Sequence, residues 1–443
     1  MHPFKASVPQ NPGRRRILQM GAGATALSAL PFGSAFARQG SNARIVILGA
    51  GAAGTAIANR LNNSLSGAKI TIAGERQQHL YQPGYTLIAS GLWPTDKVAT
   101  STAEWLPSGV SWIPSDVSEF MPDQRKVKLT NGQVLEYDLL VIATGCQLNY
   151  TDIEGMSTDL IGQKGIGSVY ASPAAASATN TQIESLISKG SGRAIFTLSN
   201  TAIKCAGAPL KMTFTTLSRL EDTGKRDQFQ VDFFTPFQNR VFSVPVYNDF
   251  VLNRWQEQQV GLHDQRTLLG IDASSKTALF SSADGQTKRE SYDFIHVVPP
   301  MSAPDAVRQS ELAWQEGPMA NQWLEIDQYN LQHRRYPEIF GVGDVIGTPF
   351  GKTAASVKKQ APVAEANILS YLAGQPLLAK YDGYTSCPLI TSIGRAVLAE
   401  FGYGGKLMPS FPFISPTEES WAVWVMKEKM LQPAYYAMLN GQV

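Results

Sequence analysis

The chain has 443 residues, a formal net charge of +2, and a composition that is 43% hydrophobic and 17% charged. This length exceeds what one hydrophobic core supports, so we expect two or three globular domains, and the composition excludes a disordered or fibrous protein. Arg14–Arg16 is the only basic run that stands out, so no nucleic-acid partner is indicated.

Residues 1–37 have the pattern of an export signal. Arg14–Arg16 precedes a small-residue apolar segment, Met20–Phe36, and the end of that segment offers a small-x-small cleavage site at Ala35–Ala37. Basic, apolar and small-residue regions in this order are typical of secretory signals, and an arginine pair before hydrophobic residues is typical of the twin-arginine type. We therefore predict a periplasmic protein with a removable leader; the alternative is a basic amphipathic anchor that is retained.

A strand–helix–strand unit begins at Arg44. Residues 44–48 are apolar and rich in β-branched side chains, residues 55–65 have alanine and leucine at helical spacing, and residues 69–73 form the second strand. In the first turn the glycines of a G-x-G-x-x-G pattern allow a tight bend, close approach of a pyrophosphate, and close packing of helix on strand. The predicted dinucleotide contacts are Gly49, Gly51, Ala52, Ala53 and Gly54.

The acid that binds the ribose is expected near the end of the second strand. Glu75 follows Gly74 there, one position later than usual, and is the candidate. The displacement indicates either a slightly longer strand end or a ribose that is held differently.

Two later motifs distinguish FAD from a nicotinamide nucleotide. Ala143-Thr144-Gly145 follows a long apolar strand and resembles the second flavin motif of flavoproteins with two dinucleotide-binding domains. Gly341-Val342-Gly343-Asp344 resembles their late motif, in which the aspartate contacts the ribityl chain. Three motifs in this order favour FAD, with predicted contacts at Thr144, Gly145, Gly343 and Asp344.

The middle of the chain has a second α/β pattern. An alanine- and serine-rich segment, 171–180, precedes a helix expected through Ile183, and strands are expected at 194–198, 230–234, 277–280 and 292–298. We predict an α/β fold with two Rossmann-like dinucleotide-binding domains and a C-terminal extension. The predicted FAD-binding domain is discontinuous, and the predicted boundaries are 41–155 and 299–375 for its two parts, 156–298 for the second domain, and 376–443 for the C-terminal region.

The second domain lacks its own nucleotide-binding glycines. Its strand at 194–198 runs into residues 199–209, which contain no G-x-G-x-x-G pattern. Side chains there would obstruct a pyrophosphate, so NADH is not expected as the reductant. Cys205 stands in that turn instead.

The chain has three cysteines, Cys146, Cys205 and Cys387. In an exported protein the first expectation is one structural disulfide and one odd thiol, and the absence of a C-x-x-C or Cys/His cluster indicates no metal site. Cys146 is interpreted as a small buried residue. Lys204 and Lys211 flank Cys205, and nearby cations favour a thiolate. Cys205 and Cys387 are both expected in turns that contain glycine or proline.

Longer strings resemble sulfide:quinone oxidoreductases, and most closely the type II branch that includes the mitochondrial enzymes. The resemblance extends over residues 43–441, and two of its shorter parts are His79–Pro83 and Lys352–Ala355. Its longer parts are Lys204–Pro209, His296–Ser302, Gln332–Pro337 and Tyr381–Leu389.

The resemblance implies that Cys205 and Cys387 are a redox pair, joined at rest by a disulfide or through an extra sulfur atom. It further implies that sulfide attacks this bridge, that a persulfide remains on one cysteine, and that two electrons pass through FAD to a quinone. Lys352 is implied beside the flavin, where its charge stabilises negative charge. Sulfite, a small thiol or further sulfide is implied as the acceptor of the oxidised sulfur.

The C-terminal residues combine aromatic and basic side chains, which suits an interfacial helix that draws quinone from lipid. Phe411, Phe413, Lys427 and Tyr435 are the candidate quinone contacts. The alternative is an arm that packs on the FAD-binding domain. After the N-terminus no apolar stretch approaches the roughly 20 residues that cross a bilayer, so only peripheral membrane contact is expected.

Two other functions stay open from the sequence. A flavoprotein subunit of the flavocytochrome c type would share FAD and the cysteine pair but pass electrons to haem. A redox-silent flavin-binding protein would carry persulfide sulfur without rapid flavin reduction. The longer strings favour the quinone-linked enzyme.

Overall fold

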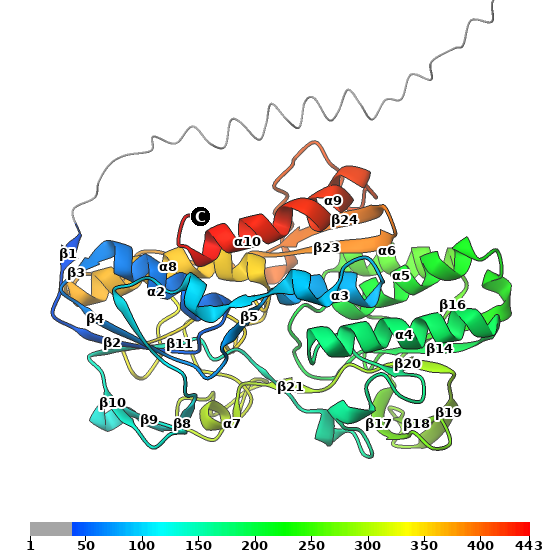
Figure 1. Ribbon diagram of the computed structural model, residues 1–443, viewed down its shortest axis with the longest axis horizontal. Helices are drawn as coiled ribbons and strands as arrows, with labels where there is room; N and C mark the ends of the chain where they lie inside the picture. The colour runs from blue at the N-terminus through cyan, green and yellow to red at the C-terminus, as the bar shows by residue number, and fades with distance from the viewer. Residues whose placement is uncertain (1–37) are drawn as a thin grey trace, which may run out of the picture. The chain divides into compact units, whose positions relative to one another are not determined.

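Two five-stranded parallel sheets organise residues 38–443, the part of the chain that the computed structural model describes (Figure 1). The predicted leader, residues 1–37, lies outside the described residues. The first sheet has the order β22-β11-β2-β4-β7, and its strands pair in parallel throughout. Its strands are β2 (Arg44–Leu48), β4 (Lys69–Ala73), β7 (Val110–Ile113), β11 (Leu139–Ile142) and β22 (Ile339–Gly341).

The first sheet is completed by a strand from late in the chain. β22 pairs with β11, and Ile142 lies beside Gly341 on one side and Leu48 on the other. Every residue of β11 is buried, as expected for a parallel strand covered on both faces. Helices α2 (Ala52–Ser64) and α8 (Ala354–Leu372) pack against each other over this sheet. The discontinuous arrangement of this sheet agrees with the fold predicted from the sequence.

The second sheet has the order β13-β20-β14-β15-β16 and is also parallel. Each of the two sheets is accompanied by a three-stranded antiparallel sheet, and the prediction of two Rossmann-like units is confirmed. The strands of the second parallel sheet are β13 (Ile166–Gly167), β14 (Gly192–Thr197), β15 (Phe229–Phe234), β16 (Val260–His263) and β20 (Phe294–His296). Its helices are α4 (Pro173–Lys189), α5 (Ala208–Asp222) and α6 (Pro245–Glu257).

The remaining elements are short or antiparallel. The two antiparallel sheets are formed by β8 (Val117–Met121), β9 (Lys126–Leu129) and β10 (Val134–Glu136), and by β17 (Thr267–Asp272), β18 (Thr277–Ser281) and β19 (Thr287–Ser291). The small elements are β1 (Gln39–Gly40), β3 (Leu65–Ser66), β5 (Gln78–Leu80), α3 (Tyr85–Ala89), β6 (Ala99–Ser101), β12 (Gln147–Leu148), β21 (Met301–Ser302) and α7 (Asp305–Arg308).

Two elements of the second domain have other boundaries than the sequence predicted. The alanine- and serine-rich segment does not precede the helix but forms its first half, because α4 begins at Pro173 with Ser172 as its N-cap. Alanine is the strongest helix former, and a serine followed by proline is a favoured helix start. The strand expected at 292–298 is shorter, and only Phe294–His296 forms ladder pairs.

The C-terminal region forms a hairpin followed by one bent helical segment (Figure 1). The hairpin is β23 (Thr385–Ser392) and β24 (Arg395–Phe401), and the helical segment comprises α9 (Trp421–Val425), a π-helical stretch (Met426–Met430) and α10 (Leu431–Leu439). α10 packs against α2 of the first unit. No helix within residues 38–443 combines the length and apolar character needed to cross a membrane.

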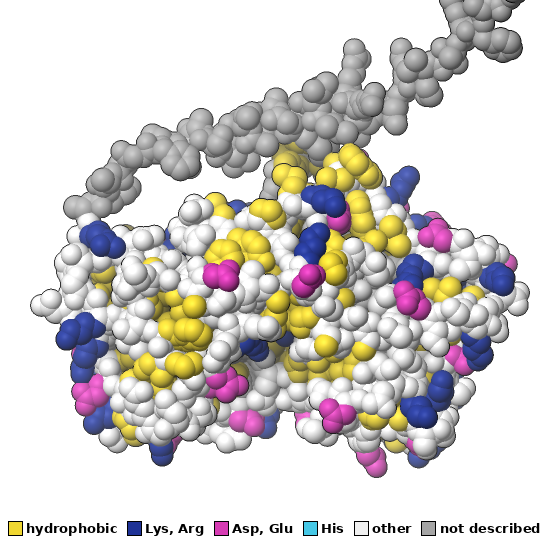
Figure 2. Space-filling view, in the orientation of Figure 1, with side chains coloured by type: hydrophobic (Ala, Val, Ile, Leu, Met, Phe, Trp, Pro, Cys, Tyr) yellow, Lys and Arg dark blue, Asp and Glu magenta, His cyan; other side chains and the backbone are white. Residues whose placement is uncertain are grey.

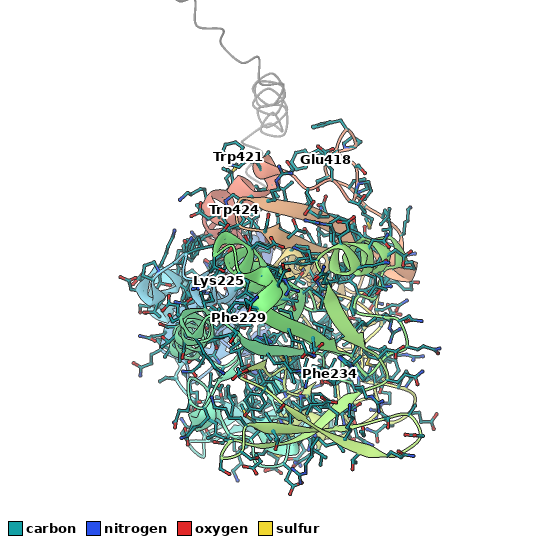
Figure 3. All side chains as sticks on the ribbon, turned by 90° about the vertical axis from the view of Figure 1, so that its right-hand side faces the viewer. Lys225, Phe229, Phe234, Glu418, Trp421 and Trp424 are labelled. Carbon is teal, nitrogen blue, oxygen red and sulfur yellow. The ribbon has the colours of Figure 1, made fainter. Side chains whose placement is uncertain are left out.

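The helical segment is anchored to the first unit by aromatic contacts. The rings of Trp105 and Tyr436 stack with centroids 4.6 Å apart, and His79 Nε2 is hydrogen-bonded to the Tyr435 hydroxyl at 2.7 Å. Trp424 is buried, whereas Trp421 on the same helix is 58% exposed (Figure 3). The C-terminal region therefore packs on the unit built around the first sheet and still presents apolar side chains to the surface.

The start of α4 gives a direct test of the helix boundary. The Ser172 hydroxyl accepts a hydrogen bond from the Ala175 peptide N–H at 3.0 Å. We expect Ser172→Ala to lower the free energy of unfolding by about 1 kcal/mol, because it removes the N-cap. Ser177→Ala, within the same helix, should be neutral or slightly stabilising, since alanine favours the helix interior. Equal effects of the two substitutions in denaturant unfolding would place the helix start elsewhere.

Candidate functional site

The glycines of the first turn have two different roles. A Cβ built on Gly49, whose φ is +101°, would lie 2.4 Å from the Ala143 carbonyl oxygen, and one on Gly54 would lie 1.8 Å from the Gly49 carbonyl oxygen. These two glycines permit close packing of the turn. A Cβ on Gly51 would meet no atom within 4 Å, and Gly51 caps α2 with no side-chain hydrogen bond. The backbone at Gly51 thus faces open space at the positive end of a helix, which suits a phosphate.

The two later motifs meet this turn at the same edge of the sheet. The Thr144 hydroxyl is buried without a hydrogen-bond partner, and a Cβ on Gly145 would meet nothing within 4 Å. Gly343 has a φ of +84° and approaches Ala53 of α2 so closely that a Cβ would lie 2.8 Å from the Ala53 methyl group. An unpaired buried hydroxyl beside open backbone indicates a ligand that supplies the missing partner. The three motifs therefore fit the expected FAD.

Glu75 lies where the ribose acid was expected, at the carboxyl end of β4. Its side chain is exposed, and its peptide N–H donates to Asp116 Oδ1 at 3.0 Å. The one-residue delay has a steric reason. Gly74 lies against the first turn, and a Cβ there would be 2.6 Å from the Ala50 nitrogen. A glycine must therefore stand at position 74, and the acid follows it.

Lys352 is buried at the edge of the first sheet, close to Asp344. Its Nζ donates to the carbonyl oxygens of Asp344 and Ile346, both at 2.7 Å, and lies 3.4 Å from the centroid of the Trp323 ring. Burial lowers the pKa of Lys352 to about 8, and burial raises the pKa of the Asp344 carboxyl. Lys352 is held by main-chain oxygens rather than by a carboxylate, so its charge is available to a ligand.

Cys205 lies in the loop between β14 and α5, two residues before the helix N-cap, Gly207. Its φ is +48°, a left-handed backbone conformation that residues other than glycine rarely adopt. The peptide N–H of Cys205 donates to the Lys352 carbonyl oxygen at 3.0 Å, and its own carbonyl accepts from Ala208 N at 2.8 Å. The first of these bonds holds the Cys205 loop of the second unit against Lys352 of the first unit, just before the N-cap of α8.

Cys387 does not lie in a turn, as the sequence suggested, but within strand β23. Its side chain is 4% exposed, and the residue pairs with Ala399 of β24. The turn prediction rested on Pro388, which lacks a peptide N–H. β23 pairs with β24 alone, so one side of the strand needs no ladder donors and proline is tolerated there.

The two sulfur atoms face each other among buried cations. The structure describes all three cysteines as free, with Cys205 and Cys387 hydrogen-bonded to each other. Lys211 Nζ lies 3.9 Å from Cys205 Sγ, and Lys211 and Lys427 are both buried. The hydrogen bond from Cys387, together with the charges of Lys211, Lys427 and Lys204, holds the pKa of Cys205 well below its usual range. The pair therefore favours one thiolate, on Cys205, with the proton on Cys387.

Lys427, a candidate quinone contact, is buried beside the sulfur pair. Its Nζ donates to the Pro83 carbonyl oxygen at 2.6 Å, and its charge acts on Cys205 and Cys387, which the sequence did not indicate. Burial lowers the pKa of Lys427 to about 7. Lys427 lies in the π-helical stretch, and such stretches often occur at functional sites.

The four candidate quinone residues fall into two groups. Lys427 and Tyr435 contact the segment around His79 and Pro83, whereas Phe411 and Phe413 pack against each other in the loop between β24 and α9, with ring centroids 6.0 Å apart. Figure 2 shows hydrophobic side chains gathered around the C-terminal helices. The large apolar side chains that are exposed between residues 376 and 443 are Leu378, Ile393, Phe413, Trp421, Met430 and Val443.

Tyr170 and Cys146 are the other groups near the sulfur pair. The Tyr170 hydroxyl donates to the Cys205 carbonyl oxygen at 3.4 Å, and burial raises the pKa of this tyrosine well above its usual value. No sequence motif points to Tyr170, because its approach to Cys205 depends on the fold of the second unit. Cys146 forms no disulfide, and burial raises the pKa of its thiol to about 11, so it favours the neutral form.

Comparisons with known proteins agree with this geometry. The model of the pyridine nucleotide-disulphide oxidoreductase family matches residues 43–188. The mitochondrial sulfide:quinone oxidoreductase of Mus musculus is 34% identical over 397 residues, which are 89% of this chain and 86% of that protein. The mitochondrial sulfide:quinone oxidoreductase of Dictyostelium discoideum is 34% identical over 401 residues, 90% of this chain and 86% of that protein.

Solved structures extend the likeness to the fold. The crystal structure of the sulfide:quinone oxidoreductase from Aquifex aeolicus superimposes with a TM-score of 0.72 and 20% identity, covering 90% of this chain and 92% of that one. The two parallel sheets and the three glycine motifs define the class, a flavoprotein with two dinucleotide-binding units. Within this class the chain belongs to the sulfide:quinone oxidoreductase family, and it is therefore an FAD-dependent oxidoreductase.

The different surroundings of Gly51 and Gly54 predict different effects of the same substitution. Gly51→Ala should leave the unfolding temperature of the FAD-free protein unchanged, because a Cβ there meets no protein atom. It should weaken FAD binding about tenfold or more, since the methyl group enters the space needed by the pyrophosphate. Gly54→Ala should destabilise the FAD-free protein itself. Calorimetry and flavin titration separate the two, and a large loss of apoprotein stability in Gly51→Ala would contradict the assignment.

The cation beside Cys205 predicts a shift in thiol reactivity. We expect Lys211→Met to raise the pKa of the Cys205 thiol by about one unit or more, because an opposite charge that favours the thiolate is removed. The measurement is the pH dependence of alkylation of Cys205 by iodoacetamide. Lys225→Met, beyond the other end of α5 (Figure 3), is the matched control and should not change this pKa.

Proposed function

We propose that this protein oxidises sulfide through Cys205 and Cys387, gives the electrons to FAD, and passes them to a quinone. The observation that carries the proposal is the pair of facing sulfur atoms among buried lysine side chains, next to the edge that fits FAD. Membership in the sulfide:quinone oxidoreductase family supports the same substrate and acceptor.

The sulfur chemistry begins from the oxidised pair, in which Cys205 and Cys387 are joined by a disulfide. Hydrosulfide attacks this bridge, one sulfur–sulfur bond breaks, and another forms between the incoming sulfur and a cysteine. A thiol with a low pKa leaves more readily, so Cys205 departs as the thiolate and the persulfide forms on Cys387. Lys211 and Lys427 stabilise the negative charge that develops on Cys205.

Turnover requires removal of the outer sulfur and of two electrons. Sulfite, a small thiol or further sulfide takes the outer sulfur from Cys387 and leaves both cysteines reduced. Bound FAD supplies the two-electron acceptor that allows the disulfide to form again. The residues that would hold FAD are those of the three glycine motifs, with Glu75, Asp344 and Lys352. The buried charge of Lys352 would favour an electron-rich group beside it.

The C-terminal region is the proposed quinone port. Among its exposed apolar side chains, Phe413, Trp421 and Met430 suit peripheral contact with a lipid surface, from which a quinone would enter. The buried Lys427 extends from this region toward the sulfur pair, and the hydroxyl of Tyr435 is hydrogen-bonded to His79. We place the protein in the periplasm, on the basis of the leader pattern in residues 1–37.

Addition of sulfide to the anaerobic FAD-loaded protein tests the proposal. We expect prompt bleaching of the flavin band, because two electrons reach FAD, and recovery of the band when a ubiquinone analogue is added. A protein that only carries sulfur would bleach slowly or not at all, and that result would overturn the proposal. Recovery with a c-type cytochrome but not with the quinone would instead favour the flavocytochrome type.

The cysteine pair is tested by single substitutions. Cys205→Ser and Cys387→Ser should each reduce sulfide-dependent quinone reduction to below about 1% of the parent rate, since no disulfide remains for sulfide to attack. The flavin content of both variants should be unchanged. Cys146→Ser is the matched control and should keep most of the rate. A variant of Cys205 or Cys387 that keeps most of its rate would exclude the mechanism.

A further inference from the structure

The backbone conformation at position 207 does not require glycine. Gly207 lies at the N-cap of α5 with φ −79° and ψ −7°, a right-handed helical conformation that any L-residue adopts. Glycine at a helix N-cap offers no side-chain oxygen to the first peptide N–H groups, and serine, aspartate or asparagine is preferred there. The backbone alone therefore does not explain a glycine at this position.

The steric surroundings of Gly207 do explain it. A Cβ built on Gly207 would lie 2.4 Å from Cys387 Sγ, a separation that two such atoms do not adopt. The next atoms, Cys387 Cβ and Lys211 Cε, would both lie at 3.8 Å, which is ordinary van der Waals contact. The only conflict is with the sulfur atom. That sulfur occupies the space in which any other residue at position 207 would place its side chain.

Cys387 cannot move away from position 207 without losing its strand pairing or its contact with Cys205. Its side chain is buried, and its backbone is fixed in the β23–β24 ladder opposite Ala399. Its sulfur must also stay within hydrogen-bond reach of Cys205, which is held by the Lys352 carbonyl. A side chain at 207 would therefore push the sulfur of Cys387 away from Cys205 or force β23 away from α5.

We propose that Gly207 is a positioning residue, which keeps the space that allows the sulfur of Cys387 to meet Cys205 at the N-terminus of α5. The proposal deepens the function given above and rests on it for its consequence in catalysis. Gly207 touches no substrate. It acts through Cys387, and its absent side chain sets the approach of the two sulfur atoms.

A double-mutant cycle tests the steric claim without sulfide. Gly207→Ala should lower the unfolding temperature of the FAD-loaded protein, kept under reductant, by at least about 3 °C. In the Cys387→Ala background the same substitution should have little effect, because the conflicting atom is gone and the backbone conformation at position 207 suits any L-residue. Equal destabilisation in both backgrounds would overturn the proposal, since it would show a need for glycine that is unrelated to the sulfur.

The catalytic consequence is tested by flavin reduction. Gly207→Ala should slow bleaching by sulfide about a hundredfold and raise the pKa of the Cys205 thiol, because displacing Cys387 weakens the hydrogen bond that lowers this pKa. Ala206→Ser is the matched control: it adds one heavy atom at the exposed neighbouring position and should change neither quantity. If Gly207→Ala bleaches as fast as this control, the proposal is wrong. Failure of the parent protein to bleach would overturn the sulfide chemistry, whereas the stability cycle decides the steric claim by itself.

Discussion

One main-chain hydrogen bond joins the two units at the site, from the peptide N–H of Cys205 to the carbonyl oxygen of Lys352. It connects the loop after a central strand of the second sheet with the residue that leads into α8 of the first. The ammonium group of the same Lys352 donates to the carbonyl oxygens of Asp344, in the late glycine motif, and of Ile346. Lys352 is thereby bonded both to the loop of the sulfur pair and to the late glycine motif that fits FAD. The bond from the Cys205 peptide N–H also maintains the left-handed backbone of Cys205.

The charge balance of the site follows from burial. Lys211 and Lys427 are almost fully enclosed, and an enclosed ammonium group is costly unless an anion lies near it. Among the described residues around them the acceptors are sulfur atoms and the Pro83 carbonyl, rather than carboxylates. A thiolate on Cys205 therefore stabilises the lysines as they stabilise it. The site is arranged for a negative charge on sulfur, as the proposed attack of hydrosulfide on the cysteine pair requires.

The sequence was informative where a motif has one structural meaning. The glycine turn, the Ala-Thr-Gly and Gly-Val-Gly-Asp motifs and the strand pattern predicted both parallel sheets, because each depends on local geometry. It failed where distant segments meet. Nothing local to Lys427 indicates that it approaches Cys205, and Pro388 misleadingly suggested a turn because the single-sided pairing of β23 is a tertiary property. The wrong start of α4 had a different origin: the alanine-rich segment was expected before the helix, although alanine is the strongest helix former and the segment belongs to the helix.

The completion of the first sheet by β22 has a consequence for biogenesis. β22 joins β11 only after nearly two hundred intervening residues, which build the whole second unit. Long-range pairing of this kind is slow, because the entropy cost of closing the intervening loop precedes the contacts that offset it. The Gly343 N–H, held by Gln360 of α8, and the turn at Thr144 cannot face each other earlier. The three glycine motifs can therefore come together only once the chain has been synthesised as far as α8.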